Sequence, residues 1–306
     1  MDAAATVAAF WAAAAPGWIR HADRHDVRGR PLGEVALRWL SVRPGERVLD
    51  VGCGCGGTTA ALAAAATAAG VEVPAGGDGG GGEAAGAGVP TGGGAVGVDL
   101  SAAMIEAARS RFPSGRHAGL RFLDADIERL DVVPGGPFDA AYSRMVLMLL
   151  ADPVAGCATV RRSLRPGGRL AATVFRAGPG NAWLPAAMLG AAPHLGALPP
   201  LPVGDEPGPF ALAEPRRIDR VLTAAGFVDV AAEPHDVVME APDEPEDVAE
   251  WLIELGPAGA PYRQAPPDAQ AAARAGAAKL LARFRESGTG YRIPSALWLV
   301  TAVVPG

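Results

Sequence analysis

The stretch Asp50-Val51-Gly52-Cys53-Gly54-Cys55-Gly56-Gly57 combines an acid with closely spaced glycines, a pattern suited to binding a ligand. It ends a short apolar run over 46–51 that predicts a strand, and it precedes a helix predicted over 57–69. Glycines at such a turn let the backbone bend sharply and let a ligand approach the main chain closely. The following helix directs its free N–H groups and its positive dipole end toward whatever is bound.

Asp50 narrows the class of ligand. Gly52, Gly54 and Gly57 also satisfy the G-x-G-x-x-G pattern of dinucleotide-binding proteins. A carboxylate two residues before the first glycine would repel a pyrophosphate and attract an ammonium group, by about 4 kcal/mol at about 4 Å and an effective dielectric of about 20. The loop therefore favours a ligand with a cationic group, with a turn-capping role for Asp50 as the alternative.

The elements around this loop alternate between strands and helices. Further strands are predicted near 95–99, 119–124, 138–143 and 168–175, in GFVDVAAEPHDVVME and in SALWLVTAVV, and helices follow most of them, one capped by Ser101. This alternation predicts an α/β fold: a doubly wound, mostly parallel, Rossmann-like seven-stranded sheet with helices on both faces and helical lid insertions.

Four regions are expected along the 306 residues. Residues 1–45 form an N-terminal helical segment that covers the ligand site, with helices over 2–15 and 31–41, and residues 46–177 form the Rossmann-like ligand-binding core. Within the core, 70–94 is a Gly-rich insertion expected to be flexible, because its composition cannot offset the entropy of ordering it. Residues 178–213 form a Pro/Gly-rich lid insertion with a helix near 181–192. Residues 214–306 complete the sheet and carry a second insertion, 243–288, read as two helices.

Composition excludes several classes of protein. The net charge of -6 and the absence of any Lys/Arg run argue against nucleic-acid binding. Three cysteines cannot form a disulfide framework and show no metal-site pattern, so no metal is expected and a reducing cytoplasm fits best. Asp2 stands where a signal peptide needs positive charge, and no apolar run reaches the length needed to insert into a membrane. The oligomeric state is left open.

Four segments, taken together, resemble a known family. VLDVGCGCGG is similar to the first motif of class I S-adenosylmethionine-dependent methyltransferases, and GVDLSAAMIEAAR is similar to their second-strand motif, which ends in Asp99. FLDADI and LRPGGRL resemble the adenine-bracketing segment and the turn before the fifth strand. YSRMVLMLLADP, GPFALAEPRRIDRVLTAAGFVDV and AWLVTA look most like the ubiquinone/menaquinone-biosynthesis-type small-molecule methyltransferases. The resemblance covers nearly the whole chain except the Gly-rich insertion, which lengthens the usual spacing between the first two motifs.

The resemblance implies S-adenosyl-L-methionine as cofactor and assigns it a set of residues. Asp50 and the loop would hold the methionine part, Asp99 both ribose hydroxyls and Asp124 the adenine amino group, with Asp126 an open alternative to Asp124 and Ile127 on the adenine face. The full set of expected cofactor-binding residues is Asp50, Gly52, Cys53, Gly54, Gly56, Asp99, Leu100, Asp124, Ala125 and Ser143.

The acceptor is expected to be a small molecule, but its identity and the catalytic residues cannot be read from the sequence. Methyl transfer is an in-line displacement that mainly needs alignment of the reactants, so a base is optional. Candidates for the acceptor pocket are Trp11, Trp18, His21, Ser143, Arg144 and Trp183. For the tryptophans, packing in the core is an equally good interpretation. For Arg144, an ion pair that only stabilises the fold is the first expectation. An NAD(P)-dependent oxidoreductase and a non-catalytic S-adenosylmethionine-binding protein are the alternative functions.

Overall fold

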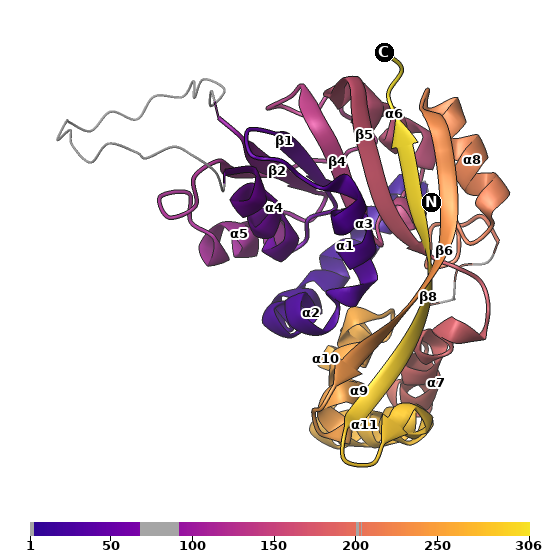
Figure 1. Cartoon of the computed structure of the whole chain (residues 1–306). Coiled ribbons are helices and arrows are strands. Elements are labelled where there is room, and N and C mark those ends of the chain that lie inside the picture. Colours follow the sequence, from indigo (N-terminus) through magenta and orange to yellow (C-terminus); the bar gives the residue numbers. More distant parts are fainter. Residues whose placement is uncertain (1–2, 68–91, 200–201, 203) are drawn as a thin grey trace.

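A computed structural model describes residues 3–67, 92–199, 202 and 204–306. The chain begins with three helices and then alternates strands with helices (Figure 1). The α-helices are α1 Ala3–Arg20, α2 Ala22–Arg28, α3 Pro31–Leu40, α4 Gly57–Thr67, α5 Ala102–Arg111, α6 Pro153–Ser163, α7 Trp183–Leu195, α8 Pro215–Ala224, α9 Pro245–Leu255, α10 Gly259–Gln264 and α11 Pro267–Leu281. The strands are β1 Arg47–Val51, β2 Gly94–Asp99, β3 Leu120–Asp124, β4 Phe138–Arg144, β5 Leu164–Phe175, β6 Val228–Ala241, β7 Arg285–Glu286 and β8 Gly290–Val303.

The predicted Rossmann-like α/β fold is confirmed. Seven strands follow the order β3-β2-β1-β4-β5-β8-β6, and the short β7 adds an eighth strand beside β8. The pairs from β3 through β5 are parallel, whereas β8 runs antiparallel to both β5 and β6. The strand order reverses direction between β1 and β4, and ligands of such open sheets bind outside the carboxyl ends of the strands at this point.

The sheet separates two apolar layers, which explains why its strands are so apolar. Along β1, Val48 packs with α3, α4 and α5 on one face, while Leu49 and Val51 pack on the other with α6 and α8. Side chains of a strand alternate between faces, so a strand covered on both faces is apolar at nearly every position. Asp50 breaks this run on the Val48 face, where a purely structural strand would carry another apolar residue.

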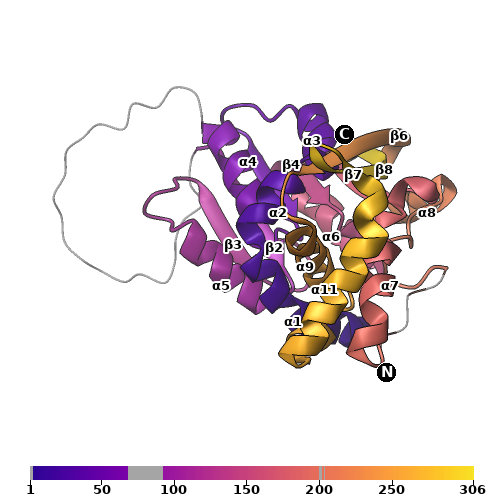
Figure 2. The same ribbon diagram turned by 90° about the horizontal axis from the view of Figure 1, so that it is seen from below.

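The two predicted insertions pack together as one helical group. Helix α11 packs against α7 and α9, and these helices lie beside the long outer ends of β6 and β8 (Figures 1 and 2). The expectation of two helices in 243–288 was wrong, because α9, α10 and α11 form three and β7 ends the segment. In the N-terminal segment, the first helix runs on to Arg20 and α2 was not predicted.

The ends of the Gly-rich insertion lie at the amino edge of the sheet. Most of 70–94 is outside the described residues, but Gly94 already belongs to β2 and its N–H donates to the Glu46 carbonyl (2.9 Å). At the other end of the insertion, Gly45 N–H donates to the carbonyl of Ala66 (2.8 Å). The described residues that flank the insertion, Ala66 and Gly94, therefore lie beside the start of β1, at the edge opposite the loop at 52–57.

Candidate functional site

Sheet register places several charged and polar side chains on one face. Asp50 pairs with Gly97 on β2 and with Tyr142 on β4, and Asp99 pairs with Asp124 on β3. Because side chains alternate with a period of two, Asp50, Asp99 and Asp124 point to the same face as Tyr142 and Arg144. The carboxyl ends of β3, β2, β1 and β4 thus form one polar row on the face of the sheet that α3, α4 and α5 cover.

The loop after β1 is built as the glycine spacing predicts. Gly52 and Gly54 have φ of 71° and 53°, which favours glycine, and the N–H groups of Gly52 and Cys53 both donate to the Val98 carbonyl (2.8 and 3.1 Å). A Cβ on Gly52 would lie 2.3 Å from Val146, so no side chain fits there. A Cβ on Gly54 would find no atom nearer than the Met104 sulfur at 4.0 Å, so open space adjoins the loop at this residue.

Asp99 joins the loop to β2 and keeps further capacity to accept hydrogen bonds. Its carboxylate accepts the N–H of Gly54 and the N–H of Ser101, each at 2.9 Å. Burial raises the pKa of Asp99, the two backbone hydrogen bonds oppose this rise, and nearby Asp124 adds to it. The side chain remains part-exposed, and an ionised carboxylate has about four lone-pair sites, so two ribose hydroxyls can still donate to it.

Asp50 is more deeply buried than a ligand-binding acid needs to be. It is 2% exposed, and its Oδ2 accepts a hydrogen bond from the Thr59 hydroxyl at 2.7 Å. Burial raises the pKa of Asp50 to about 6, against the opposing effects of Thr59 and the positive charge of Arg144. Asp50 therefore places a negative charge beneath the loop that a cationic ligand would stabilise; direct contact with an ammonium group stays a prediction.

The two acids that competed for the adenine role differ in what they already bind. Asp126 accepts the N–H of Glu128 (2.9 Å) and lies 3.2 Å from Nε of Arg129, so it stabilises its own turn. Asp124 is exposed at the tip of β3 and makes neither kind of bond within the described part of the chain. Ala125 N–H donates to the Asp99 carbonyl (3.0 Å), which brings this turn beside β2. Because Asp124 has acceptor oxygens that are free within this part of the chain, it is the better candidate of the two for binding the adenine amino group.

Helix α2 lies across the start of α4. A Cβ on Gly57 would lie 2.2 Å from Oδ2 of Asp26, so the carboxylate sits directly on the first residue of α4. Arg111 binds Asp26 at 2.6 Å and donates to the Cys55 carbonyl at 2.6 Å, which fastens α2 to the loop. The N-terminal segment thus adjoins the loop, as its predicted covering role requires.

Four residues that the sequence assigned to the cofactor or acceptor site make other contacts or are buried in the core. Ser143 is fully buried and its hydroxyl donates to the Val51 carbonyl (3.2 Å), so any contact with a ligand would involve its backbone. The Trp183 indole donates to Ser295 (3.1 Å) within the core, which separates it from the other acceptor candidates. Burial raises the pKa of the Cys53 thiol, so this thiol stays protonated. Ile127 is buried in the core cluster.

Sequence reasoning missed His25 and Trp251. The rings of Trp18 and His25 are 4.8 Å apart, and Trp251 on α9 lies 6.5 Å from His25 on the other side. Trp11 continues the row, 5.8 Å from Trp18. The seven-residue spacing of positions 11, 18 and 25, two turns of a helix, was the available signal for His25. Trp251 could not be found this way, because a distant segment supplies it.

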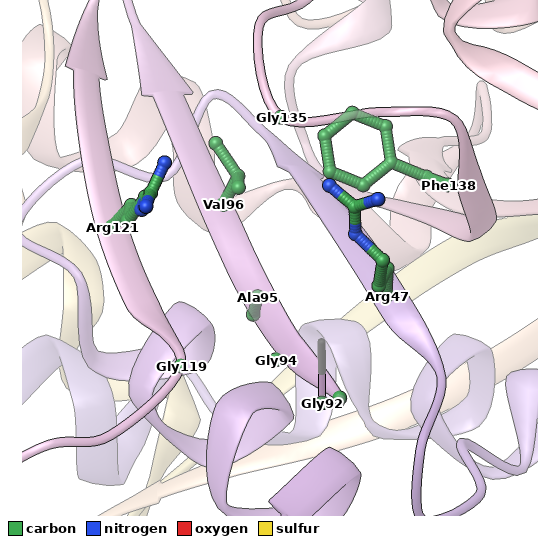
Figure 3. A pocket seen from close by; sticks show the side chains of 10 residues that line it. Arg47, Gly92, Gly94, Ala95, Val96, Gly119, Arg121, Gly135 and Phe138 are labelled. Carbon is green, nitrogen blue, oxygen red and sulfur yellow. The ribbon is translucent and has the colours of Figure 1, made fainter. Parts of the chain in front are cut away.

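Two hollows in the described residues lie away from both the acidic strand ends and the aromatic row of Trp11, Trp18 and His25. One, of about 20 Å³, lies between Arg47, Val96 and Phe138 at the amino half of the sheet (Figure 3). The other, of about 450 Å³, lies beside α8 and is lined by Phe210, Arg216 and Arg220 among others. Neither includes a predicted cofactor residue, so the site is defined by its side chains and the space beside Gly54.

Comparison with known proteins identifies the domain type. A family described as "Methyltransferase domain" matches residues 75–172, which include Asp99 and Asp124 but begin after the Gly-rich loop. A malonyl-[acyl-carrier protein] O-methyltransferase from Paenibacillus sp. (strain JDR-2) is 39% identical over 79 residues, 26% of this chain and 29% of that protein. Nocamycin O-methyltransferase from Saccharothrix syringae is 28% identical over 233 residues, 70% of each chain.

The solved structures support the fold. The YcgJ protein of Bacillus subtilis superposes with a TM-score of 0.53 at 14% identity, covering 91% of this chain and 99% of that one. The chain spans about a third of the length of the first curated relatives it matches. The matched family and these relatives agree with the sequence motifs that residues 75–172 belong to a methyltransferase domain, and the solved structure agrees with the Rossmann-like fold.

Proposed function

We propose that the chain transfers the methyl group of S-adenosylmethionine to an oxygen of a small molecule. One observation carries this proposal: Asp124, Asp99 and Asp50 lie on one face of three adjacent strands around a glycine turn. Such a row matches a ligand with hydroxyl and amino donors along its length and a positive charge at one end. The names of two curated relatives, a malonyl-[acyl-carrier protein] and a nocamycin O-methyltransferase, support oxygen as the acceptor atom.

The residues of the chain would position the cofactor rather than react with it. When bound, S-adenosylmethionine supplies an electrophilic methyl group on a positively charged sulfur. Asp99 would bind the ribose, Asp124 the adenine amino group and the loop at Gly54 the methionine part, with Asp50 neutralising positive charge from below. Cys53, Leu100 and Ala125 would line the same edge through their backbones. Helix α2 above the loop would exclude water, and alignment of this kind can contribute about 7–11 kcal/mol to a displacement.

Calorimetry and a turnover assay test the proposal. The purified chain should bind S-adenosylhomocysteine and not NADH, and it should release S-adenosylhomocysteine from S-adenosylmethionine in the presence of a suitable acceptor. Binding of NADH alone would favour the oxidoreductase alternative, which has no support among the relatives described above. Binding of S-adenosylhomocysteine without turnover across a broad acceptor panel would favour a non-catalytic binding protein.

A further inference from the structure

Arg144 carries a positive charge that the fold does not neutralise. It ends β4 beside the Gly-rich loop, and none of the residues in 3–67, 92–199, 202 and 204–306 forms a hydrogen bond or ion pair with its guanidinium group. The default expectation of an ion pair was therefore wrong within this part of the chain. The side chain is nevertheless held in place: a Cβ on Gly33 of α3 would lie 2.8 Å from its Cδ. A part-buried cation without a partner is the exception in proteins.

Several buried polar atoms beside Arg144, or beside His25, whose pKa the charge of Arg144 lowers, also have no partner among the described residues. They are Nε1 of Trp18, Nε1 of Trp251, Nδ1 of His25 and the hydroxyl of Tyr142, and the residues Trp251 and Tyr142 are each 1% exposed. Nδ1 of His25 donates in the tautomer that places the proton on it. Tyr142 precedes Arg144 on the same face of β4, and the two indoles flank His25. Indole and guanidinium groups can only donate hydrogen bonds, and a tyrosine hydroxyl can donate as well. The group that would satisfy all of them is one that only accepts hydrogen bonds.

His25 does not supply the missing negative partner, nor does it add positive charge. Burial lowers the pKa of His25 to about 3, and the positive charge of Arg144 lowers it further, as does His21 when it is protonated; burial lowers the pKa of His21 to about 4. The ring is therefore neutral near pH 7. Asp50 is bound to Thr59 and lies on the strand next to that of Arg144, and Glu254 of α9 accepts a hydrogen bond from Arg20 (2.7 Å). The cluster is thus a cation with neutral donors around it.

We infer that this cluster, Arg144 with Trp18, Tyr142 and Trp251, binds the methyl acceptor, and that the acceptor presents a carboxylate. The inference rests on the proposed function and adds the chemical class of the acceptor. An ionised carboxylate accepts hydrogen bonds only and pairs with the planar guanidinium group in two-point fashion. The indole rings on either side of His25 supply apolar surface for the body of the acceptor.

The chemistry of this step balances without a catalytic base. A carboxylate oxygen forms a bond to the methyl carbon of S-adenosylmethionine while the methyl–sulfur bond breaks, and the electron pair of that bond goes to sulfur. The products are a methyl ester and neutral S-adenosylhomocysteine, and no proton is transferred. This step fits a site that holds a neutral imidazole and a fixed cation. The role of Arg144 is to hold the acceptor oxygen in line.

Matched acceptor pairs test the inference. Phenylacetate, indole-3-acetate and malonyl-N-acetylcysteamine are each assayed beside the corresponding carboxamide and alcohol, by release of S-adenosylhomocysteine and by base-labile methyl ester in the product. We expect turnover of acids only. If turnover is too slow to follow, binding of the acids is measured instead, by the quenching of tryptophan fluorescence in the presence of S-adenosylhomocysteine. Methylation of the alcohols alone, or no saturable response to any acid, overturns the inference.

Variants separate the acceptor role of Arg144 from a role in cofactor binding. Arg144→Gln should raise the KM or Kd for the acids at least tenfold and leave the Kd for S-adenosylhomocysteine within twofold. Arg144→Lys keeps the charge without the planar guanidinium group, so its KM or Kd for the acids should lie between those of the unaltered chain and Arg144→Gln. Trp251→Phe should raise the KM several-fold. Arg38→Gln, whose side chain is 62% exposed on α3, is the matched control and should change neither value.

Two results would contradict the acceptor assignment for different reasons. A parallel loss of S-adenosylhomocysteine binding in Arg144→Gln would assign the guanidinium group to the carboxylate of the cofactor, and the acceptor subsite would fail while the proposed function stood. Failure of the unaltered chain to bind S-adenosylhomocysteine at all would instead remove the proposed function itself. Arg144→Lys guards against a folding defect, because it retains the stem that packs against Gly33.

Discussion

Replacing Asp99 with alanine should weaken cofactor binding more than any other single change at the strand tips. The carboxylate already accepts the N–H groups of Gly54 and Ser101 at 2.9 Å, so its position is fixed before the ligand arrives. Two ribose hydroxyls would add charge-assisted hydrogen bonds, which contribute about 1.5–3 kcal/mol to binding. This corresponds to a Kd for S-adenosylhomocysteine raised roughly 10- to 150-fold. Asp99→Asn, which keeps one carbonyl oxygen, should show a smaller rise.

Calorimetric titration with S-adenosylhomocysteine measures this effect, with circular dichroism to show that each variant is folded. The matched control is Asp139→Ala, at the amino end of β4. Asp139 also accepts a backbone N–H, that of Arg47 at 2.7 Å, and it pairs with Arg165, but it lies at the opposite edge of the sheet. Asp139→Ala should lower the melting temperature and leave the Kd unchanged. A folded Asp99→Ala protein with a Kd within twofold of the unaltered chain would refute the site.

Three further outcomes are expected. Asp124→Ala should weaken the free energy of S-adenosylhomocysteine binding by about 0.5–1.5 kcal/mol, whereas Asp126→Ala should chiefly lower the melting temperature; the reverse result would exchange their roles. Affinity for S-adenosylmethionine should be constant above pH 6 and fall up to about tenfold per pH unit below it, because protonating Asp50, whose pKa burial raises to about 6, removes the charge that attracts the cation; a flat titration would exclude Asp50. Gly190→Ala should destabilise the fold by about 1–3 kcal/mol in denaturant unfolding, since its Cβ would lie 2.5 Å from the backbone of α11, while Gly115→Ala, with open space around it, is a neutral control.

The parts of the site that are local in sequence could be predicted from sequence. The strand boundaries near Asp50 and Asp99 fell within a residue or two of those observed, because each strand is an apolar run that ends at an acid or a glycine. Parallel strands bring their carboxyl ends to one edge, so naming the strands was enough to bring these acids together. The Ser101 cap of α5 was read correctly for the same reason: its hydroxyl accepts the N–H of Met104, three residues on.

The residues that were missed or misassigned depend on contacts between distant segments. Trp251 meets His25 across more than 200 residues, and only the packing of α9 against α1 brings them together. Trp183 was grouped with the acceptor candidates by residue type, but Ser295 on β8 binds its indole in the core. The ion-pair default for Arg144 was a sound statistical expectation, and a missing partner cannot be read from a sequence. Pattern analysis shows which side chains lie on one face and not which distant helix covers them.

The charges at the carboxyl edge link the fold to its proposed ligands. Asp99 disfavours the charged form of Asp50, Asp124 disfavours that of Asp99, and burial raises the pKa of both Asp50 and Asp99. On the neighbouring strand β4, Arg144 lowers the pKa of Asp50 but forms no ion pair within the described residues. The fold thus keeps uncompensated negative charge over β1–β3 and uncompensated positive charge at β4. A cationic nucleoside over the acids and an anionic acceptor at Arg144 would neutralise both, and each would stabilise binding of the other, because opposite charges a few ångströms apart attract strongly where water is excluded. Binding of the acids should therefore be tighter to the complex with S-adenosylmethionine than to the complex with S-adenosylhomocysteine, which lacks the sulfonium charge.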